Sequence, residues 1–453
     1  MIEKQLQILQ KDFTADEFRQ RRIKLYEQLN GASALIKGAP HDGSSDVFRQ
    51  YNEFYYLCGI ERSHSYLLLD GSTRTTTLFM TERSAHEMRD QGVSIGLQDA
   101  ELVKQASAVD EVLGLDQLAE KINAIDCLYI MSTWGEGRMA YQDTLRVCAK
   151  DVQADPMDQR PNEAAYFIEK VKSINPAVEI KDLFPIIEKM RIIKSPAEIE
   201  LMHKAGKVTA LAVLEAMKST KAGVYEYHLQ AIADYVYRLH GCRGAGYKPI
   251  IATGDNIWNT HYYRCHSELK DGDLVLMDYA CDLRNYTSDI GRFWPVNGKY
   301  SDKQRNFYGW VVDYHKCLLE HIRPGVLASD IESEVAAIME ERLATMTFED
   351  EETKKGFYKT LTTRHLTHGV GMTVHDSGNY YPDILEPGVV IAVDPQMWIP
   401  EKEFYIRVED TIVVTEDGCL NFTDLAPLDL DDTEKVIGTG GMLQAFPQNK
   451  DIL

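Results

Sequence analysis

Acidic residues inside apolar, strand-forming runs are the feature that most restricts how this chain can fold. Asp278 follows the apolar run 274–277, and Asp289 lies in the strand-like segment 286–295. A carboxylate buried in a strand costs several kcal/mol unless it is paired or binds a metal ion. A fold that buries these strands must therefore bring a partner to both carboxylates.

The spacing of the two aspartates indicates how they could meet. They are 11 residues apart, and Arg284-Asn285 lies between them. This distance suits two adjacent strands joined by a short turn, which would point both carboxylates at one place. On this observation alone, two solvent-exposed aspartates at strand edges remain an equally good interpretation.

Further metal-binding residue types follow in the same half of the chain. His368 and His375 lie in the glycine-containing segment 367–376, Asp394 ends the apolar run 390–393, and Glu409 lies in the strand-like segment 406–412. Carboxylates and imidazoles without thiolates suit Mn, Fe, Co or Zn. Carboxylates can bridge two ions about 3.5–4 Å apart, and such a pair activates water and polarises a carbonyl. The pattern therefore indicates hydrolysis of a peptide or amide.

Composition excludes several other classes of protein. The 453 residues favour two domains, and the net charge of −21, without any basic run, argues against binding to nucleic acid or anionic lipid. The N-terminal segment lacks the apolar core of a signal peptide, so we expect a cytoplasmic protein without a membrane partner. None of the eight cysteines forms a CxxC pair, and we expect reduced thiols.

The chain changes character near residue 190. Before it, segments 33–36, 54–57, 66–69, 75–80 and 127–131 are strand-like, and Asp70-Gly71 predicts a hairpin turn. Ser195, Pro196 and Glu198 then form a helix start with a capping box, followed by apolar residues at helical spacing up to Ala216. We therefore expect a mixed α/β domain that ends at 175–190, before this helix.

The second half alternates predicted strands and helices. The strands are expected at 249–253, 274–279, 286–295, 389–393 and 405–414, and the helices near 224–240, 302–321 and 329–345. The tail after about residue 430 is rich in Asp and Gly. Its segment 438–441 (GTGG) follows no dinucleotide-fold strand, so a surface loop is favoured over a phosphate loop.

Several segments around the acidic residues resemble the Xaa-Pro aminopeptidase/prolidase (M24 peptidase) family. Residues 271–278 (DGDLVLMD) are similar to the family's run before its first metal ligand. Residues 385–388 (LEPG) are similar to the run before its fourth ligand, and residues 406–410 (IRVED) to the segment of its fifth. Residues 51–59 (YNEFYYLCG) and 67–70 resemble the N-terminal domain of aminopeptidase P, so the resemblance covers roughly residues 20 to 425.

This resemblance implies a role for each candidate residue. The metal ligands would be Asp278, Asp289, His368, Asp394 and Glu409. His261 would lie at the substrate cleft, His375 would contact the substrate carbonyl and the developing oxyanion, and Arg407 would support the site. Asp394 would also be the general base, so the expected catalytic set is His261, His375, Asp394 and Arg407.

The resemblance also implies a fold and an activity. The fold class is α/β (α+β), with an aminopeptidase P-like domain at 1–180, a pita-bread (creatinase/aminopeptidase-like) catalytic domain at 185–430 and a C-terminal tail at 431–453. The expected activity removes the N-terminal residue from peptides with proline second. Two divalent ions would be required, Mn²⁺ being favoured over Co²⁺, Zn²⁺ or Fe²⁺. The expected partner is a small peptide, and the expected assembly a homodimer or homotetramer.

Two segments depart from the family pattern. Where the family has Glu-Pro-Gly, this chain has Asp394-Pro395-Gln396, whose carboxylate is one methylene shorter. Around His368, the chain has Arg364 and Thr367 where the family usually has His or Ala, and Gly or Ser. Two alternatives therefore stay open: a non-peptidase enzyme of the same fold acting on a small C–N or C–S substrate, and a binding protein with an impaired site.

Overall fold

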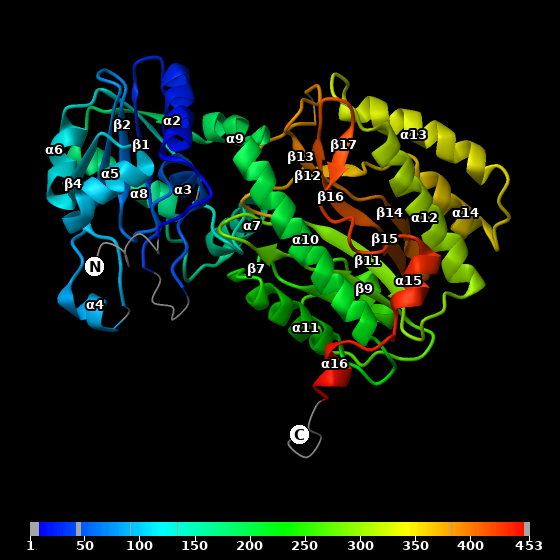
Figure 1. Ribbon diagram of the computed structural model, residues 1–453. Coiled ribbons are helices and arrows are strands. Elements are labelled where there is room, and N and C mark those ends of the chain that lie inside the picture. The colour runs from blue at the N-terminus through cyan, green and yellow to red at the C-terminus, as the bar shows by residue number, and fades with distance from the viewer. Residues whose placement is uncertain (1–8, 42–46, 91, 134, 382, 448–453) are drawn as a thin grey trace. The chain divides into compact units, whose positions relative to one another are not determined.

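The computed structural model describes residues 9–41, 47–90, 92–133, 135–381 and 383–447 (Figure 1). The chain divides into two compact units between Arg191 and Ile192. Within the described ranges, no helix is long and apolar enough to cross a membrane.

The first unit is built on a mixed sheet of six strands in the order β4-β3-β2-β1-β5-β6. Strands β1, β2 and β3 are antiparallel neighbours, whereas β4, β5 and β6 add in parallel. The strands are β1 (Ser33–Lys37), β2 (Tyr66–Asp70), β3 (Thr75–Met80), β4 (Glu111–Gly114), β5 (Cys127–Ile130) and β6 (Glu179–Asp182). The helices are α2 (Ala15–Leu29), α3 (Asn52–Cys58), α4 (Ala85–Asp90), α5 (Ala100–Ser107), α6 (Leu118–Asn123), α7 (Gln142–Ala154), α8 (Glu163–Ile174) and α9 (Phe184–Ile192).

The strand predicted at 54–57 is wrong, because these residues belong to helix α3. Every residue of this short helix is buried, so its apolar run has no polar face from which a helical period could be detected. Gly59 ends the helix with φ of 67° and donates its N–H to the carbonyl of Tyr55. A side chain at Gly59 would also collide with the Phe18 ring.

The second unit is built on an antiparallel sheet in the order β12-β13-β16-β11-β9-β8, and β17 adds beside β16. Its strands are β8 (Ile250–Thr253), β9 (Leu274–Asp278), β11 (Ile290–Pro295), β12 (Leu366–Gly369), β13 (Val390–Val393), β16 (Glu409–Val414) and β17 (Cys419–Asn421). Two small ribbons accompany it, β7 (Gly244–Ala245) with β10 (Cys281–Asp282), and β14 (Gln396–Ile399) with β15 (Phe404–Arg407).

Helices flank this sheet. Helices α10 (Pro196–Ser219) and α11 (Glu226–Leu239) lie side by side, and so do α12 (Asp302–His321) and α13 (Ala328–Leu343) (Figure 1). The remaining helices are α14 (Glu351–Thr360), α15 (Leu430–Val436) and α16 (Met442–Ala445). The predicted start of α10 is confirmed, because Ser195 and Glu198 form the reciprocal capping box.

Two predicted strands differ from the observed ones in ways that matter for the site. The segment 286–295 becomes a strand only from Ile290, so Asp289 lies just before β11 rather than inside it. The segment 405–414 divides at Val408, because β15 pairs with β14 whereas β16 pairs with β11 and β13. The chain thus changes partners between Arg407 and Glu409.

Candidate metal centre

Five adjacent strands bring acidic and imidazole side chains to one end of the second sheet. Asp278 ends β9, Asp289 precedes β11, Glu409 begins β16, Asp394 follows β13 and His368 lies in β12. Since all these strands are antiparallel neighbours, the end of one adjoins the beginning of the next. The structure therefore places the five predicted ligands together.

Gly291 keeps the space between these side chains open. It is the cross-strand neighbour of both Asp278 and Glu409. A Cβ atom at this position would lie 3.0 Å from the Glu409 Cβ and 3.0 Å from Arg407 Nε. Any larger residue would fill the cradle into which the carboxylates point.

His368 completes a compact group of donors. One donor atom each from Asp289, His368 and Glu409 lies within 4.8 Å of the other two. The Nε2 atom of His368 is 3.5 Å from Asp289 Oδ2 and 3.9 Å from Glu409 Oε1. Its Nδ1 atom is 3.1 Å from the Gly369 carbonyl, and this contact orients the ring with Nε2 toward the carboxylates.

Tyr247 is a site residue that the sequence did not reveal. Its hydroxyl lies 2.7 Å from Asp278 Oδ1 and 2.7 Å from Asp289 Oδ1, so one phenol joins the two aspartates. Burial, together with the two carboxylates, raises the pKa of Tyr247 well above its usual value, so the group stays a neutral donor. A lone tyrosine in the segment 244–249 carries no pattern that could have identified it.

Arg407 is the cation at the centre of the cluster. It donates to Asp278 Oδ2 at 2.8 Å, its Nε is 3.4 Å from Asp394 Oδ1, and it contacts the Glu409 carboxylate. Burial alone would lower the pKa of Arg407, but the charges of Asp394 and Asp278 outweigh it and raise the pKa well above the usual value. One guanidinium therefore offsets only part of the charge of four carboxylates.

The carboxylates are crowded and poorly solvated. Burial, then repulsion by Asp278, raises the pKa of Asp289 well above its usual value. Burial raises the pKa of Asp394 to about 6, although Arg407 and Gln396 oppose the shift. Such a cluster is stable only with protons or further positive charge.

Two more predicted residues lie beside this cluster. The His375 ring stands 4.2 Å from the His368 ring, measured between centroids, and the next residue, Asp376, forms a buried ion pair of 3.0 Å with Lys194. His261 is exposed, and it lies near enough to Asp278, Arg407 and His375 for their charges to affect it. Partial desolvation lowers its pKa, so its imidazole is neutral at neutral pH.

The donor set fits divalent metal ions. The Oδ1 atom of Asp394 is buried and accepts no hydrogen bond from the residues that the structure describes. The four carboxylates and one imidazole are the hard and borderline donors that Mn, Fe, Co and Zn prefer. Ions bound here would supply the positive charge that a single guanidinium does not.

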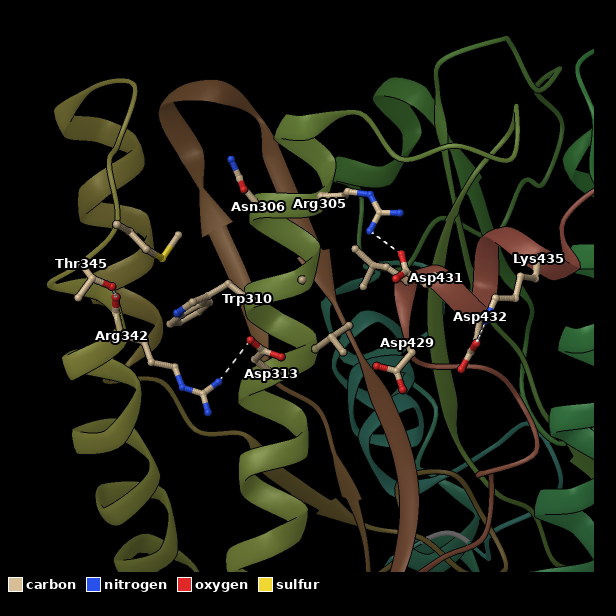
Figure 2. Close-up of a pocket in the computed structure, with 14 residues that line it drawn as sticks. Arg305, Asn306, Trp310, Asp313, Arg342, Thr345, Asp429, Asp431, Asp432 and Lys435 are labelled. Carbon is tan, nitrogen blue, oxygen red and sulfur yellow. Dashed lines mark hydrogen bonds and ion pairs between the residues drawn. The ribbon is translucent and has the colours of Figure 1, made fainter.

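A separate surface groove lies elsewhere in the same unit. It has a volume of about 710 Å³ and lies between α12, the end of α13 and α15 (Figure 2). Its charges pair with each other, Arg305 with Asp431 at 2.9 Å and Arg342 with Asp313 at 3.3 Å. Among the described residues that line this groove, none belongs to the carboxylate cluster, so the groove is not part of the metal centre.

Metal binding is expected to weaken in acid, and the raised pKa of Asp394, about 6, sets the range. Because the pKa of Asp394 is raised in the folded state, the folded metal-free protein is most stable with this carboxyl protonated. The contribution of the protonated carboxyl to the free energy of unfolding is lost as pH rises through about 6. Ions need the carboxylate, so stabilisation by metal increases over the same range. Unfolding midpoints with and without Mn²⁺, measured at about pH 5 and about pH 7.5, are expected to differ more at the higher pH. An equal effect of Mn²⁺ on the unfolding midpoint at both pH values would contradict this prediction.

The site and the fold together define a metal-dependent hydrolase. Comparison with known families agrees. Residues 200–416 match the model of metallopeptidase family M24, and residues 18–127 match the aminopeptidase P N-terminal domain. The chain belongs to family M24, and more particularly it is a metallo-aminopeptidase of the kind found in the relatives below.

Among curated relatives, the Xaa-Pro aminopeptidase of Escherichia coli is 33% identical over 439 residues, which cover 91% of this chain and 95% of the relative. Human Xaa-Pro aminopeptidase 3 is 29% identical, covering 87% of this chain and 78% of the relative. Zinc-substituted E. coli aminopeptidase P with its product has a similar structure, with a TM-score of 0.75, 28% identity, and coverage of 94% of this chain and 98% of the neighbour.

These matches confirm several expectations. The mixed α/β fold with a C-terminal pita-bread domain is that of the aminopeptidase P structures. Membership of M24 implies divalent metal ions, and it makes the chain a hydrolase. The non-peptidase and binding-protein alternatives are not favoured, because the relatives that match most of this chain are named as aminopeptidases.

Proposed function

We propose that this protein removes the N-terminal residue from peptides whose second residue is proline. The observation that carries the proposal is the convergence of Asp278, Asp289, His368, Asp394 and Glu409 at one end of the sheet, around Arg407. The relatives named Xaa-Pro aminopeptidase support the choice of substrate. The five residues would hold two divalent ions, and Mn²⁺ is the ion favoured by the oxygen-rich donor set.

The ions would polarise the scissile carbonyl and lower the pKa of the attacking water. The chain's own groups would carry the proton and orient the peptide. Asp394 is suited to be the general base, because its buried Oδ1 accepts no hydrogen bond from the described residues and can take a proton from the attacking water and return it to the leaving nitrogen. His375 would donate a hydrogen bond to the carbonyl oxygen as charge develops there.

His261 is proposed to line the substrate cleft. Its imidazole is exposed beside Asp278, so it can contact a peptide held at the cluster. Arg407 would hold Asp278 and Asp394 in place rather than contact the substrate. The site residues would thus divide between holding the ions, moving the proton and orienting the peptide.

The remaining expectations are proposals of the same kind. The aminopeptidase P-like domain would comprise residues 1–180, the catalytic domain 185–430 and the tail 431–453. We propose a cytoplasmic homodimer or homotetramer that acts on small peptides; a plant relative is described as mitochondrial, so cell fractionation is the relevant test. Size-exclusion chromatography with light scattering measures the assembly.

A panel of Xaa-Pro peptides tests the activity. Metal-free protein reloaded with Mn²⁺, Co²⁺, Zn²⁺ or Fe²⁺ is expected to release the first residue from Ala-Pro-type peptides and to leave matched Ala-Ala peptides intact. Equal rates on both peptide series would refute the proline requirement. Metal binding without hydrolysis of any peptide would favour the alternative of a binding protein with an impaired site.

Substitution of His375 by alanine is expected to lower kcat on these peptides by about 100-fold, the usual cost of losing one donor to the developing oxyanion. Metal content should not change, because the expected ligand is His368. Steady-state kinetics and elemental analysis measure the two effects. The matched control is His203→Ala, which removes a ring that stacks on Phe422 and should leave kcat unchanged. Loss of metal from His375→Ala would instead make His375 a ligand.

A further inference from the structure

Gln396 occupies a position that couples it to the carboxylate cluster. It is the first residue of β14 and lies two residues after Asp394. Across the β14–β15 ribbon its partner is Arg407, the central cation of the cluster. The chain and the strand pairing thus place Gln396 beside both Asp394, the proposed base, and Arg407, which contacts it.

The Gln396 side chain bridges Asp394 to a buried tyrosine. Its Nε2 amide donates to Asp394 Oδ2, and its Oε1 accepts a hydrogen bond of 3.2 Å from the Tyr405 hydroxyl. Burial raises the pKa of Tyr405, so its hydroxyl stays a donor. A carboxylate only accepts hydrogen bonds, and the hydroxyl donates to Oε1, so both neighbours require the same orientation of the amide.

This bridge makes the two oxygens of Asp394 unequal. Oδ2 is occupied by the Gln396 amide. Oδ1 lies 3.4 Å from Arg407 Nε and accepts no hydrogen bond from the described residues. The backbone N–H of Asp394 is held by the His365 carbonyl at 2.7 Å, so the main chain is fixed too. Of the two oxygens, only Oδ1 has no hydrogen-bond donor among the described residues.

We propose that Gln396 is a positioning residue that makes the shorter carboxylate of Asp394 work as a one-oxygen ligand and base. The inference rests on the proposed function. Aspartate and glutamine would then act as a pair, in place of the glutamate and glycine of the resembling sequences. The glutamine amide fills the volume that a longer side chain at position 394 would need. Glutamate there is accommodated only when residue 396 is small.

A double-mutant cycle tests the pair. Asp394→Glu alone is expected to lower kcat on Ala-Pro-type peptides by about 10- to 100-fold, because the added methylene displaces the carboxylate. Gln396→Gly alone is expected to lower kcat by on the order of tenfold, with KM nearly unchanged. The double variant Asp394→Glu/Gln396→Gly is expected to recover most of the wild-type kcat. Multiplicative losses in the double variant would overturn the proposal.

A second measurement does not depend on turnover. Titration of metal-free protein with Mn²⁺, followed by calorimetry, is expected to show about 10- to 100-fold weaker binding in Gln396→Ala, the usual cost of losing a group that orients a ligand. Alanine keeps the strand backbone ordinary, so the result separates the amide from the flexibility of glycine. Unchanged Mn²⁺ affinity in Gln396→Ala would overturn the proposal.

Tyr405→Phe provides the matched hydroxyl test. It removes the donor that orients the amide, so kcat and Mn²⁺ affinity should both fall. The control Tyr380→Phe removes a hydroxyl that donates to the Leu366 carbonyl, and it should change neither. Equal effects of the two substitutions would overturn the proposal. If the wild-type protein cleaves no Xaa-Pro peptide, the proposed function is wrong. The Mn²⁺ titrations would still decide whether Gln396 positions Asp394.

Discussion

Asparagine in place of Asp289 is expected to remove most metal binding and to lower kcat/KM by more than about 100-fold. Loss of a group that merely orients a ligand already costs about 10- to 100-fold, and Asp289 would be a ligand itself. Asparagine keeps the shape and can still accept the Tyr247 hydroxyl, so the change removes charge and little else. The effect should appear as lost metal in elemental analysis and as lost turnover.

The same substitution should not destabilise the metal-free protein. Burial and the charge of Asp278 raise the pKa of Asp289, so its ionised form is disfavoured when no ion is bound. A neutral amide relieves that repulsion, and the metal-free unfolding midpoint should stay the same or rise. The control Asp282→Asn changes a buried aspartate that accepts the Asn285 N–H, a bond that asparagine can also accept. Full metal occupancy in Asp289→Asn would contradict the ligand assignment.

The second large effect is expected from Arg407→Met. Removing one partner from a buried ionic cluster typically costs about 3–5 kcal/mol, because the remaining charges lose their compensation. Arg407 contacts three carboxylates, so the metal-free protein should lose that amount, and its unfolding midpoint should fall by roughly 5–15 °C. Bound ions supply positive charge to the same carboxylates, so Mn²⁺ should recover much of the loss.

Arg292→Met is the matched control for this prediction. Arg292 is also buried and donates to Asp410 Oδ1 at 2.6 Å and to the Glu409 carbonyl at 2.7 Å. Adjacent residues of a strand point to opposite faces, so Arg292 and Asp410 lie behind Gly291 and Glu409. Its loss should destabilise the protein, but Mn²⁺ should recover little. Thermal scans of both variants, each with and without Mn²⁺, make the comparison. Recovery to the same degree in both would show that the ions do not act at Arg407.

The cost of burying charge singled out the acidic members of the site in the sequence, and the resemblance to the M24 family implied their roles and that of His368. Asp278 and Asp394 adjoin apolar strands and Glu409 begins one, and such placement is tolerated only with a shared partner. The turn between Asp278 and Asp289 also followed from local chemistry, since Arg284 and Asn285 adopt positive φ values of 52° and 74° in a tight turn. Asp289 nonetheless precedes its strand, a detail that the apolar pattern did not contain.

Tertiary structure decided the contacts between residues far apart in the chain. Nothing local distinguishes Tyr247 from other tyrosines, and only the pairing of the sheet places its hydroxyl between two aspartates. The tight space at Gly291 likewise arises because β9 and β16 lie on either side of β11. Helix α3 was missed for the related reason that a fully buried helix shows no polar face.

By itself, the sequence therefore determined which side chains must be neutralised, where the second unit's first helix begins and which family the chain resembles. The first two follow from residue type, spacing and the cost of burying charge, all of which are local properties, and the third from segments that are similar to those of the family. Only the tertiary structure decided how the charges are shared. Arg407 contacts three carboxylates, and Gln396 donates a hydrogen bond to one oxygen of Asp394. The physical reason is that hydrogen bonds and ion pairs act over a few ångströms, and the sheet alone sets which distant residues come that close.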